Sequence, residues 1–300
     1  MAGATPSITQ RWVARHLPPR PARAHKGDHG RILVVAGSLD YPGAALLTAL
    51  GAMRAGAGVV RIATAESVAA RLAGSIPELT WMPLDEEAPG LIAPGGWRRV
   101  TTEAVGYDAA VIGPGLGSQP ATQRRARQLI ASLTVPGVVD ADGLNALAAG
   151  SRWWQALRSP LVLTPHPGEF ARLTGQAAPD GDDDEARARA AADAAVRWDQ
   201  VVVLKGAHTV VAEPGGQLLA SAIATPALAT AGSGDVLAGA IGAFLAAGAE
   251  PFAAAACGVA VHGAAGLIAA DRIGTTGTMA RDIAALLPEA IAQLRSDRAR

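Results

Sequence analysis

Short apolar runs, rich in β-branched residues, recur along the chain and constrain its fold more than any other feature. They lie at residues 32–36, 59–63, 109–112, 137–140, 161–164 and 201–204. Ala-rich sequence or turns separate them, and most end at a glycine or a polar cluster. Strands that are apolar on both faces are typical of a parallel sheet covered by helices on both sides. The sequence therefore predicts an α/β fold, in which helices flank both faces of a doubly wound, mostly parallel sheet.

Several segments outside these runs are expected to be helices. Their approximate bounds are 8–16, 44–55, 169–174, 185–197, 235–247, 251–270 and 280–294. Residues 209–212 are expected to form a further strand that pairs with the segment after it. Residues 79–100 are rich in proline and glycine, which predicts a connecting loop. We expect one domain over residues 1–300, in which residues 1–24 form an N-terminal helix and a Pro-rich lead-in.

Composition excludes some classes of partner. Lys plus Arg (26) balance Asp plus Glu (26), which gives a formal net charge of +0. That balance favours neither nucleic acid nor an anionic membrane surface. Residues 251–270 carry no Lys, Arg, Asp or Glu, but they are mostly Ala and Gly and include His262. This composition favours a buried helix over a membrane span.

The cysteine content and the N-terminus bear on location. Cys257 is the one cysteine of the chain, so an intramolecular disulfide is impossible and a reducing compartment is the simpler assumption. Residues 1–23 lack the apolar core of a secretory signal, although their basic character leaves a transit peptide open. We therefore expect a cytoplasmic protein.

Polar and Gly-rich clusters follow the predicted strands. They lie at residues 37–38, 113–117, 140–145, 164–169 and 205–209. Ligands of open α/β sheets bind outside the carboxyl ends of the strands, so these clusters predict a single large cleft. The cluster at 113–117 has the spacing Gly-x-Gly-x-Gly rather than Gly-x-Gly-x-x-Gly, which disfavours a nicotinamide oxidoreductase.

The sequence Ala-Gly-Ser-Gly-Asp at residues 231–235 leads into a long Ala-rich segment. Its glycines let a ligand approach the backbone closely. The free N–H groups of a helix start, together with the helix dipole, favour a phosphate or a developing oxyanion. Asp235 then stands in the first turn, either as a catalytic base or only as a helix cap. The other motifs of the chain favour the base.

Several motifs, in order and with sensible spacing, carry a resemblance to one enzyme family. The Gly-Ser-Gly-Asp run is similar to the signature of the ribokinase-like superfamily. The further motifs lie at residues 26–31, 36–38, 42–45, 54–58, 112–117, 139–145, 163–169 and 203–209. Together they resemble the ADP/ATP-dependent NAD(P)H-hydrate dehydratases over residues 8–294. The resemblance implies a ribokinase-like fold.

The resemblance also implies an activity. The family repairs hydrated NADH and NADPH: it uses ADP or ATP to phosphorylate the added hydroxyl, then eliminates phosphate to restore the double bond. For this chain it implies action on the S epimer, Mg²⁺ as cofactor and a homotetramer. The epimerase domain fused in some relatives has no room in 300 residues, so pairing with a separate epimerase is expected.

Site residues follow from the resemblance position by position. Asp235 is the implied base. The hydrated dinucleotide is expected to contact Ala44, Gly117, His166 and Asp235. The nucleotide is expected to contact Lys205, Gly206, Ala207, His208, Thr209 and Gly234. The amides of Gly232, Ser233 and Gly234 form the implied anion hole, and Glu169 and Asp142 face magnesium, directly or through water.

Several polar residues of these motifs also have a structural interpretation. His166, between two prolines, either contacts a ligand or makes a structural hydrogen bond. Glu169 either faces the metal or complements the dipole of the helix that it starts. Asp140 and Asp142 either hold magnesium or brace their loop. Lys205 either meets phosphate as a point charge or is an exposed surface lysine.

Two departures from the family pattern and two other functions stay open. Ser233 replaces the Thr of many relatives but keeps the hydroxyl. Thr225-Pro226-Ala227 replaces a frequent Asn-Pro-Gly, with an open consequence for the turn. The alternative functions are a kinase of the same superfamily that acts on a vitamin-like alcohol, and a non-catalytic nucleotide-binding regulator.

Overall fold

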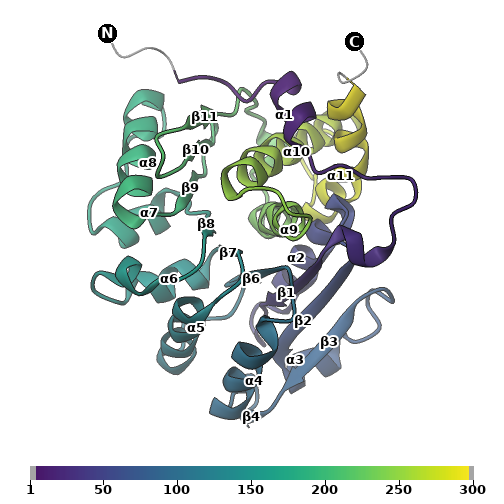
Figure 1. The fold of residues 1–300 in the computed structure, drawn as a ribbon, viewed down its shortest axis with the longest axis vertical. Helices are drawn as coiled ribbons and strands as arrows, with labels where there is room; N and C mark the ends of the chain where they lie inside the picture. The colour runs from purple at the N-terminus through teal and green to yellow at the C-terminus, as the bar shows by residue number, and fades with distance from the viewer. Residues whose placement is uncertain (1–4, 297–300) are drawn as a thin grey trace.

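A nine-stranded sheet lies between two layers of helices in the computed structural model, which describes residues 5–296 (Figure 1). Its strands, in spatial order, are β11 (Leu218–Ala220), β10 (Val210–Ala212), β9 (Val201–Leu204), β8 (Leu161–Leu163), β7 (Gly137–Val139), β6 (Ala109–Ile112), β1 (Arg31–Val35), β2 (Val59–Ala65) and β3 (Thr80–Leu84). Neighbours from β9 to β3 are parallel, and β10 and β11 are antiparallel. The mostly parallel sheet is therefore confirmed.

Alternate side chains of each strand feed two separate cores. Ile32 and Val34 face one core, whereas Leu33 and Val35 face the other, as the two-residue period of a strand requires. The first core is covered by α1 (Gln10–His16), α2 (Pro42–Ala55), α9 (Ser233–Ala246), α10 (Pro251–Arg272) and α11 (Ala280–Arg295). The second is covered by α3 (Glu66–Leu72), α4 (Pro94–Ala104), α5 (Pro120–Ser132), α6 (Asp142–Ala148), α7 (Pro167–Thr174) and α8 (Asp184–Trp198).

Residues 79–100 are not a connecting loop, so that prediction was wrong. They form β3, the two-stranded sheet of β4 (Glu86–Ala88) and β5 (Leu91–Ile92), and the start of α4. The prolines stand where secondary structure tolerates them: Pro83 lies in an edge strand and Pro94 at the first turn of α4. Met82 and Leu84 are buried, and this burial rather than local propensity holds the segment.

Two glycine-mediated contacts hold α9 against α2. A Cβ at Gly239 would lie 2.0 Å from the carbonyl oxygen of Thr48, and one at Gly51 would lie 2.3 Å from that of Val236. A side chain at either position would push the helices apart. The close packing fixes the N-terminus of α9 over the sheet.

Helix α10 is the only described helix long and apolar enough to cross a membrane, but 78% of its apolar stretch is buried inside the structure. It packs between α9 and α11 in the first core. The expectation of a buried helix at residues 251–270 is met.

The strand order reverses between β1 and β6. The chain continues from β1 to β2 on one side and from β6 to β7 on the other. The loops that follow these two strands meet, because the Gly37 N–H donates to the Pro114 carbonyl at 2.8 Å. Such a reversal opens the crevice in which α/β sheets bind their ligands.

Candidate active site

Four helices begin at the crevice. Helices α2, α6 and α7 start shortly after β1, β7 and β8, and α9 starts beside α2. The end of β9 reaches the same place, because a Cβ on Gly234 would lie 3.4 Å from Lys205 Nζ and 3.9 Å from Asp140 Oδ2. Helix N-termini present free N–H groups and positive dipole ends, so the crevice favours anionic groups such as phosphates.

A buried ion pair joins two strand ends that are 65 residues apart in sequence. Lys205 Nζ donates to Asp140 Oδ1 at 2.7 Å and lies 3.8 Å from Glu169 Oε2. Thr164 Oγ1 also donates to Asp140 Oδ1, at 2.8 Å. Burial lowers the pKa of Lys205, but the charges of Asp140 and Glu169 outweigh it and raise that pKa overall. Lys205 is thus a fixed cation of the site rather than a surface lysine.

Asp235 lies in the first turn of α9 without a structural partner. Within residues 5–296 its carboxylate accepts no hydrogen bond, and α9 has no side-chain cap at Gly232. Burial raises the pKa of Asp235 to about 7; Asp140 adds to the rise and Lys205 opposes it. A carboxylate with this pKa can take up a proton at neutral pH, which suits a general base. The cap interpretation has no hydrogen bond to support it.

His166 and Glu169 form a capping box at the start of α7. Gly168 N–H donates to His166 Nδ1 at 3.0 Å, and His166 N–H donates to Glu169 Oε2 at 2.8 Å. Burial, with the nearby charges of Lys205 and Arg172, lowers the pKa of His166, so the ring is neutral and its proton lies on Nε2. Burial also raises the pKa of Glu169. Both residues therefore make structural hydrogen bonds. Glu169 also lies close to Lys205, and His166 also lines the cavity described below.

Asp142 braces the loop that carries Gly117. Its Oδ2 accepts the Gly117 N–H at 2.8 Å, and its Oδ1 accepts from Asn145 Nδ2 at 3.2 Å. The preceding residue, Ala141, has φ 50° and ψ −118°, a conformation that non-glycine residues rarely adopt. Such strain is found where a site needs a particular geometry. Here the strained residue stands between Asp140, which pairs with Lys205, and Asp142, which binds the Gly117 amide.

No group of three or more His, Cys, Asp or Glu side chains within residues 5–296 is arranged to hold a metal ion by itself. The site is nevertheless rich in carboxylates, since Asp140, Asp142 and Glu169 all raise the pKa of Asp235. Mg²⁺ keeps several waters and commonly takes one or two carboxylates plus substrate phosphates. This donor set fits a magnesium ion that arrives with a nucleotide.

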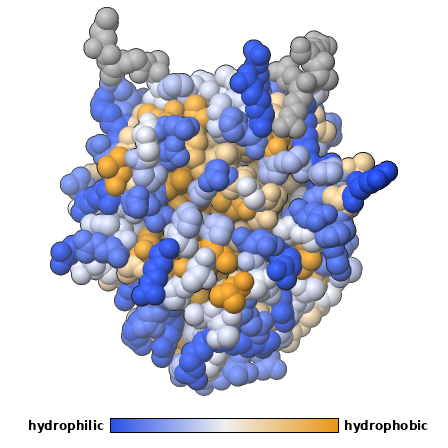
Figure 2. Space-filling view, viewed as in Figure 1, coloured by the Kyte–Doolittle hydropathy of each residue, from blue (hydrophilic) through white to orange (hydrophobic). Residues whose placement is uncertain are grey.

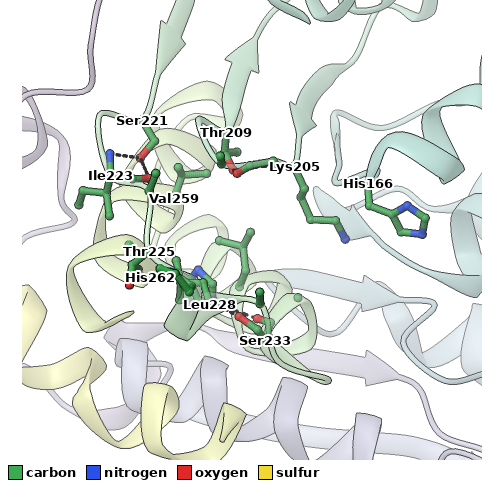
Figure 3. A pocket seen from close by; sticks show the side chains of 18 of the residues that line it. His166, Lys205, Thr209, Ser221, Ile223, Thr225, Leu228, Ser233, Val259 and His262 are labelled. Carbon is green, nitrogen blue, oxygen red and sulfur yellow. Dashed lines mark hydrogen bonds between the residues drawn. The ribbon is translucent and has the colours of Figure 1, made fainter. Parts of the chain in front are cut away.

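A cavity of about 700 Å³ opens beside this charged cluster (Figure 3). Its inner wall is apolar and includes Ile223, Leu228, Leu237 and Val259. Its lining also includes His166, Lys205, Ser233 and Gly234. The surface between the β9–β11 edge and α10 includes apolar patches among hydrophilic side chains (Figure 2). An apolar pocket with a cationic end matches a planar base that carries phosphates.

The cavity contains part of the predicted site. It is lined by Lys205, Gly206, Ala207, Thr209, Ser233, Gly234 and His166. His208 is not among the lining residues, because its Nδ1 pairs with Asp184 Oδ2 at 2.7 Å. Gly232, Asp235, Ala44 and Gly117 lie outside the cavity. Asp235 directly follows the cavity residue Gly234, so it borders the cavity without lining it.

Arg187, on α8, supports the end of β9 and the loop that follows it. Its Nη2 donates to the carbonyl oxygens of Leu204 and Lys205 at 3.3 and 3.2 Å. A Cβ at Gly206 would lie 2.1 Å from the same nitrogen, so a side chain there would displace the guanidinium. Sequence reasoning missed Arg187. The signal was a basic residue on the helix face that also presents the buried Ala188, Ala191 and Ala195.

His262, on α10, was also missed as a site residue. It is 7% exposed, lines the cavity and lies within hydrogen-bond distance of Ser233. A lone histidine in an uncharged helix was the available signal.

The segment Thr225-Pro226-Ala227 accommodates its departure from the family pattern. Thr225 Oγ1 accepts the Ala227 N–H at 3.4 Å and caps the short helix η3 (Pro226–Leu228). Ala227 does not have a positive φ, so the turn does not require glycine.

Comparisons with known proteins agree with this geometry. Residues 32–289 match the family model described as NAD(P)H-hydrate dehydratase. The ADP-dependent (S)-NAD(P)H-hydrate dehydratase of Xanthomonas campestris is 40% identical over 92% of this chain and 94% of that protein. A bifunctional NAD(P)H-hydrate repair enzyme Nnr of Moorella thermoacetica is 42% identical over 97% of this chain but 54% of its own length. The chain thus spans about half the length of the bifunctional relatives.

A solved structure gives the same picture. The ADP/ATP-dependent NAD(P)H-hydrate dehydratase of Bacillus subtilis, co-crystallized with ATP/Mg²⁺, superposes with a TM-score of 0.83 at 34% identity. The match covers 98% of this chain and 100% of that one. The expected ribokinase-like fold is confirmed.

Proposed function

The chain belongs to the NAD(P)H-hydrate dehydratase family, and on that premise we propose that it dehydrates the S epimer of hydrated NADH or NADPH at the expense of ADP or ATP. The observation that carries this proposal is the place of Asp235. Its carboxylate has no structural hydrogen bond, has a pKa of about 7, and adjoins both the cavity and the N–H groups at the start of α9.

In the first step the hydroxyl added to the nicotinamide ring attacks the terminal phosphorus of the nucleotide. Asp235 accepts the hydroxyl proton as the new O–P bond forms. The bond from that phosphorus to the bridging oxygen breaks, and AMP leaves when ADP is the donor. The amides of Gly232 to Gly234 and the ammonium of Lys205 stabilise the charge on the transferring group.

In the second step the phosphorylated ring loses phosphate. The ring nitrogen's lone pair assists departure of the C–O electron pair, and transfer of a proton from the adjacent carbon to the departing phosphate restores the double bond. The products are NAD(P)H, AMP or ADP, and phosphate. Ala44, Gly117 and His166 would contact the dinucleotide, and Lys205 to Thr209 would contact the nucleotide; for His208, the contact is assigned to its backbone.

Magnesium would be held mainly by the nucleotide phosphates, with Glu169 and Asp142 facing it directly or through water. When bound, Mg²⁺ neutralises phosphate charge during the transfer. Glu169 and Lys205 lie 3.8 Å apart, so the chain offers one anionic and one cationic group to the same phosphate region.

The test is the recovery of reduced-nicotinamide absorbance from each purified hydrate, with Mg²⁺ and either ADP or ATP. We expect recovery that depends on the nucleotide, with one equivalent of phosphate released per NAD(P)H formed. No recovery with either nucleotide on either hydrate would overturn the proposal. A stable phosphorylated product without recovered absorbance would indicate a kinase.

We further propose a cytoplasmic homotetramer that works with a separate epimerase. Names of bifunctional relatives at 40–42% identity support the pairing with a repair partner. Sedimentation analysis would test the assembly, and a single monomeric species would contradict it.

A further inference from the structure

Ser233 and His262 face each other at the floor of the cavity (Figure 3). Ser233 is the first residue of α9 and His262 lies in α10. His262 Nε2 is 3.0 Å from the Ser233 hydroxyl oxygen and also 3.0 Å from the Ser233 carbonyl oxygen. Both side chains are buried, with residue exposures of 4% and 7%.

These two distances determine where the protons lie. A carbonyl oxygen only accepts hydrogen bonds, so His262 Nε2 must carry the hydrogen and donate it. The same N–H also points to the hydroxyl oxygen of Ser233, which is therefore an acceptor in this contact. The hydroxyl keeps its own proton, and no acceptor for that proton is found among residues 5–296.

The Ser233 hydroxyl, whose proton has no acceptor in the described structure, lies where the proposed phosphoryl transfer would take place. Ser233 lines the cavity next to Gly234, and Gly234 approaches Lys205 closely. We propose that His262 is a positioning residue, which holds the Ser233 hydroxyl so that its proton is donated to the phosphoryl group in transfer. This inference rests on the proposed function and deepens it.

The surroundings of His262 keep it neutral. Burial is the main reason that its pKa is lowered to about 4; the hydrogen bond to the Ser233 carbonyl opposes this shift, and the charge of Lys205 adds to it. A neutral ring has one N–H, and the Ser233 carbonyl fixes it on Nε2. The hydroxyl therefore keeps one orientation across the neutral pH range.

The experiment compares His262→Phe, His262→Gln, Ser233→Ala and the Phe/Ala double variant. Phe keeps a flat ring without the N–H, whereas the amide of Gln can place an N–H where Nε2 stands. For Ser233→Ala we expect kcat to fall about 100-fold, as for other donors to a transition state. For His262→Phe we expect a fall of about tenfold, with the ADP Kd from calorimetry within about threefold of wild type. His262→Gln should restore most of kcat.

The double variant should be no slower than Ser233→Ala, because the histidine acts through that hydroxyl. His16→Phe, at an exposed position of α1, is the matched control. Losses that add in the double variant, a Gln variant as slow as Phe at unchanged Tm, or Ser233→Ala with wild-type kcat would each overturn the proposal.

A readout that needs no turnover separates this inference from the proposed function. Imidazole ¹⁵N spectra, assigned with His262→Phe, should show a neutral Nε2–H ring for His262 at pH 7. A Nδ1–H ring or an imidazolium would overturn the inference. An inactive wild-type enzyme with the Nε2–H ring would count against the proposed function alone.

Discussion

Side chains wall the cavity proposed for the nucleotide, whereas the side proposed for the hydrated dinucleotide includes the small residues Ala44 and Gly117. On the nucleotide side, Leu228, Leu237 and Val259 close an apolar cavity that ends at Lys205. On the other side, Asp142 holds the Gly117 amide and a Cβ at Gly115 would lie 2.7 Å from the Ala44 side chain. We expect the first half to select a ligand by shape and the second to let a large substrate approach the backbone.

Asp235 belongs to neither half. It follows Gly234 of the cavity, and its Oδ2 would lie 3.6 Å from a Cβ on Gly232, which would itself lie 2.3 Å from Leu47 of α2. The proposed base is therefore at the border between the two halves, where the proposed reaction needs a hydroxyl from one ligand to meet a phosphate from the other.

Asp235→Asn should remove the proposed base at the border while it leaves ligand binding in both halves intact. We expect kcat to fall about 10²–10⁴-fold, since a general base is lost, and the nucleotide Kd to stay near wild type. Steady-state kinetics and calorimetry measure the two quantities. An unchanged kcat would refute the assignment of the base.

Lys205→Met should destabilise the half of the crevice proposed for the nucleotide. It leaves the buried Asp140 carboxylate without its cation, so we expect the free energy of unfolding to fall by about 3 kcal/mol. Urea denaturation measures the loss, and the exposed Lys26→Met is the control. Restoration of part of the stability by adding Asp140→Asn would support this cause; equal stabilities of Lys205→Met and wild type would contradict it.

A pair of substitutions should separate the two halves. In Gly206→Ala the new Cβ meets Arg187, so we expect the nucleotide Kd to rise about tenfold and the KM for the hydrate to stay constant. In Asp142→Asn the brace on Gly117 weakens, so the reverse pattern is expected, again about tenfold. If either variant changes both constants equally, the halves are not independent.

The smallest expected effect is the change of kcat with pH, which depends on the protonation of Asp235. Because the folded pKa of Asp235 is raised to about 7, the base becomes protonated as pH falls through that value, and at pH 7 kcat should be about half its value at pH 8. The same shift means that the folded state binds this proton more tightly, so its contribution to stability is lost as pH rises from about 4 to about 7. Asp235→Asn should remove that dependence from denaturation curves, and a curve identical to wild type would contradict the shift.

Several features were predictable because they depend on local sequence. The apolar runs identified the parallel strands, and the Gly-Ser-Gly-Asp run identified the start of α9. The strands within residues 79–100 were not predictable, because they depend on pairing with β2 and on burial against the second core. Arg187 and His262 were not, because each acts on an element far away in sequence: Lys205 is 18 residues and Ser233 29 residues distant.

By itself the sequence determined the α/β class, the order of the strand-end clusters and the presence of a glycine-rich helix start at residues 231–235, since periodicity and glycine spacing are properties of neighbouring residues. The tertiary structure alone decided that Asp140 neutralises Lys205, that His208 pairs with Asp184 instead of lining the cavity, and that Asp235 has a pKa near 7. The physical reason is that charge–charge energies and desolvation depend on distance and burial, which spacing along the chain does not specify.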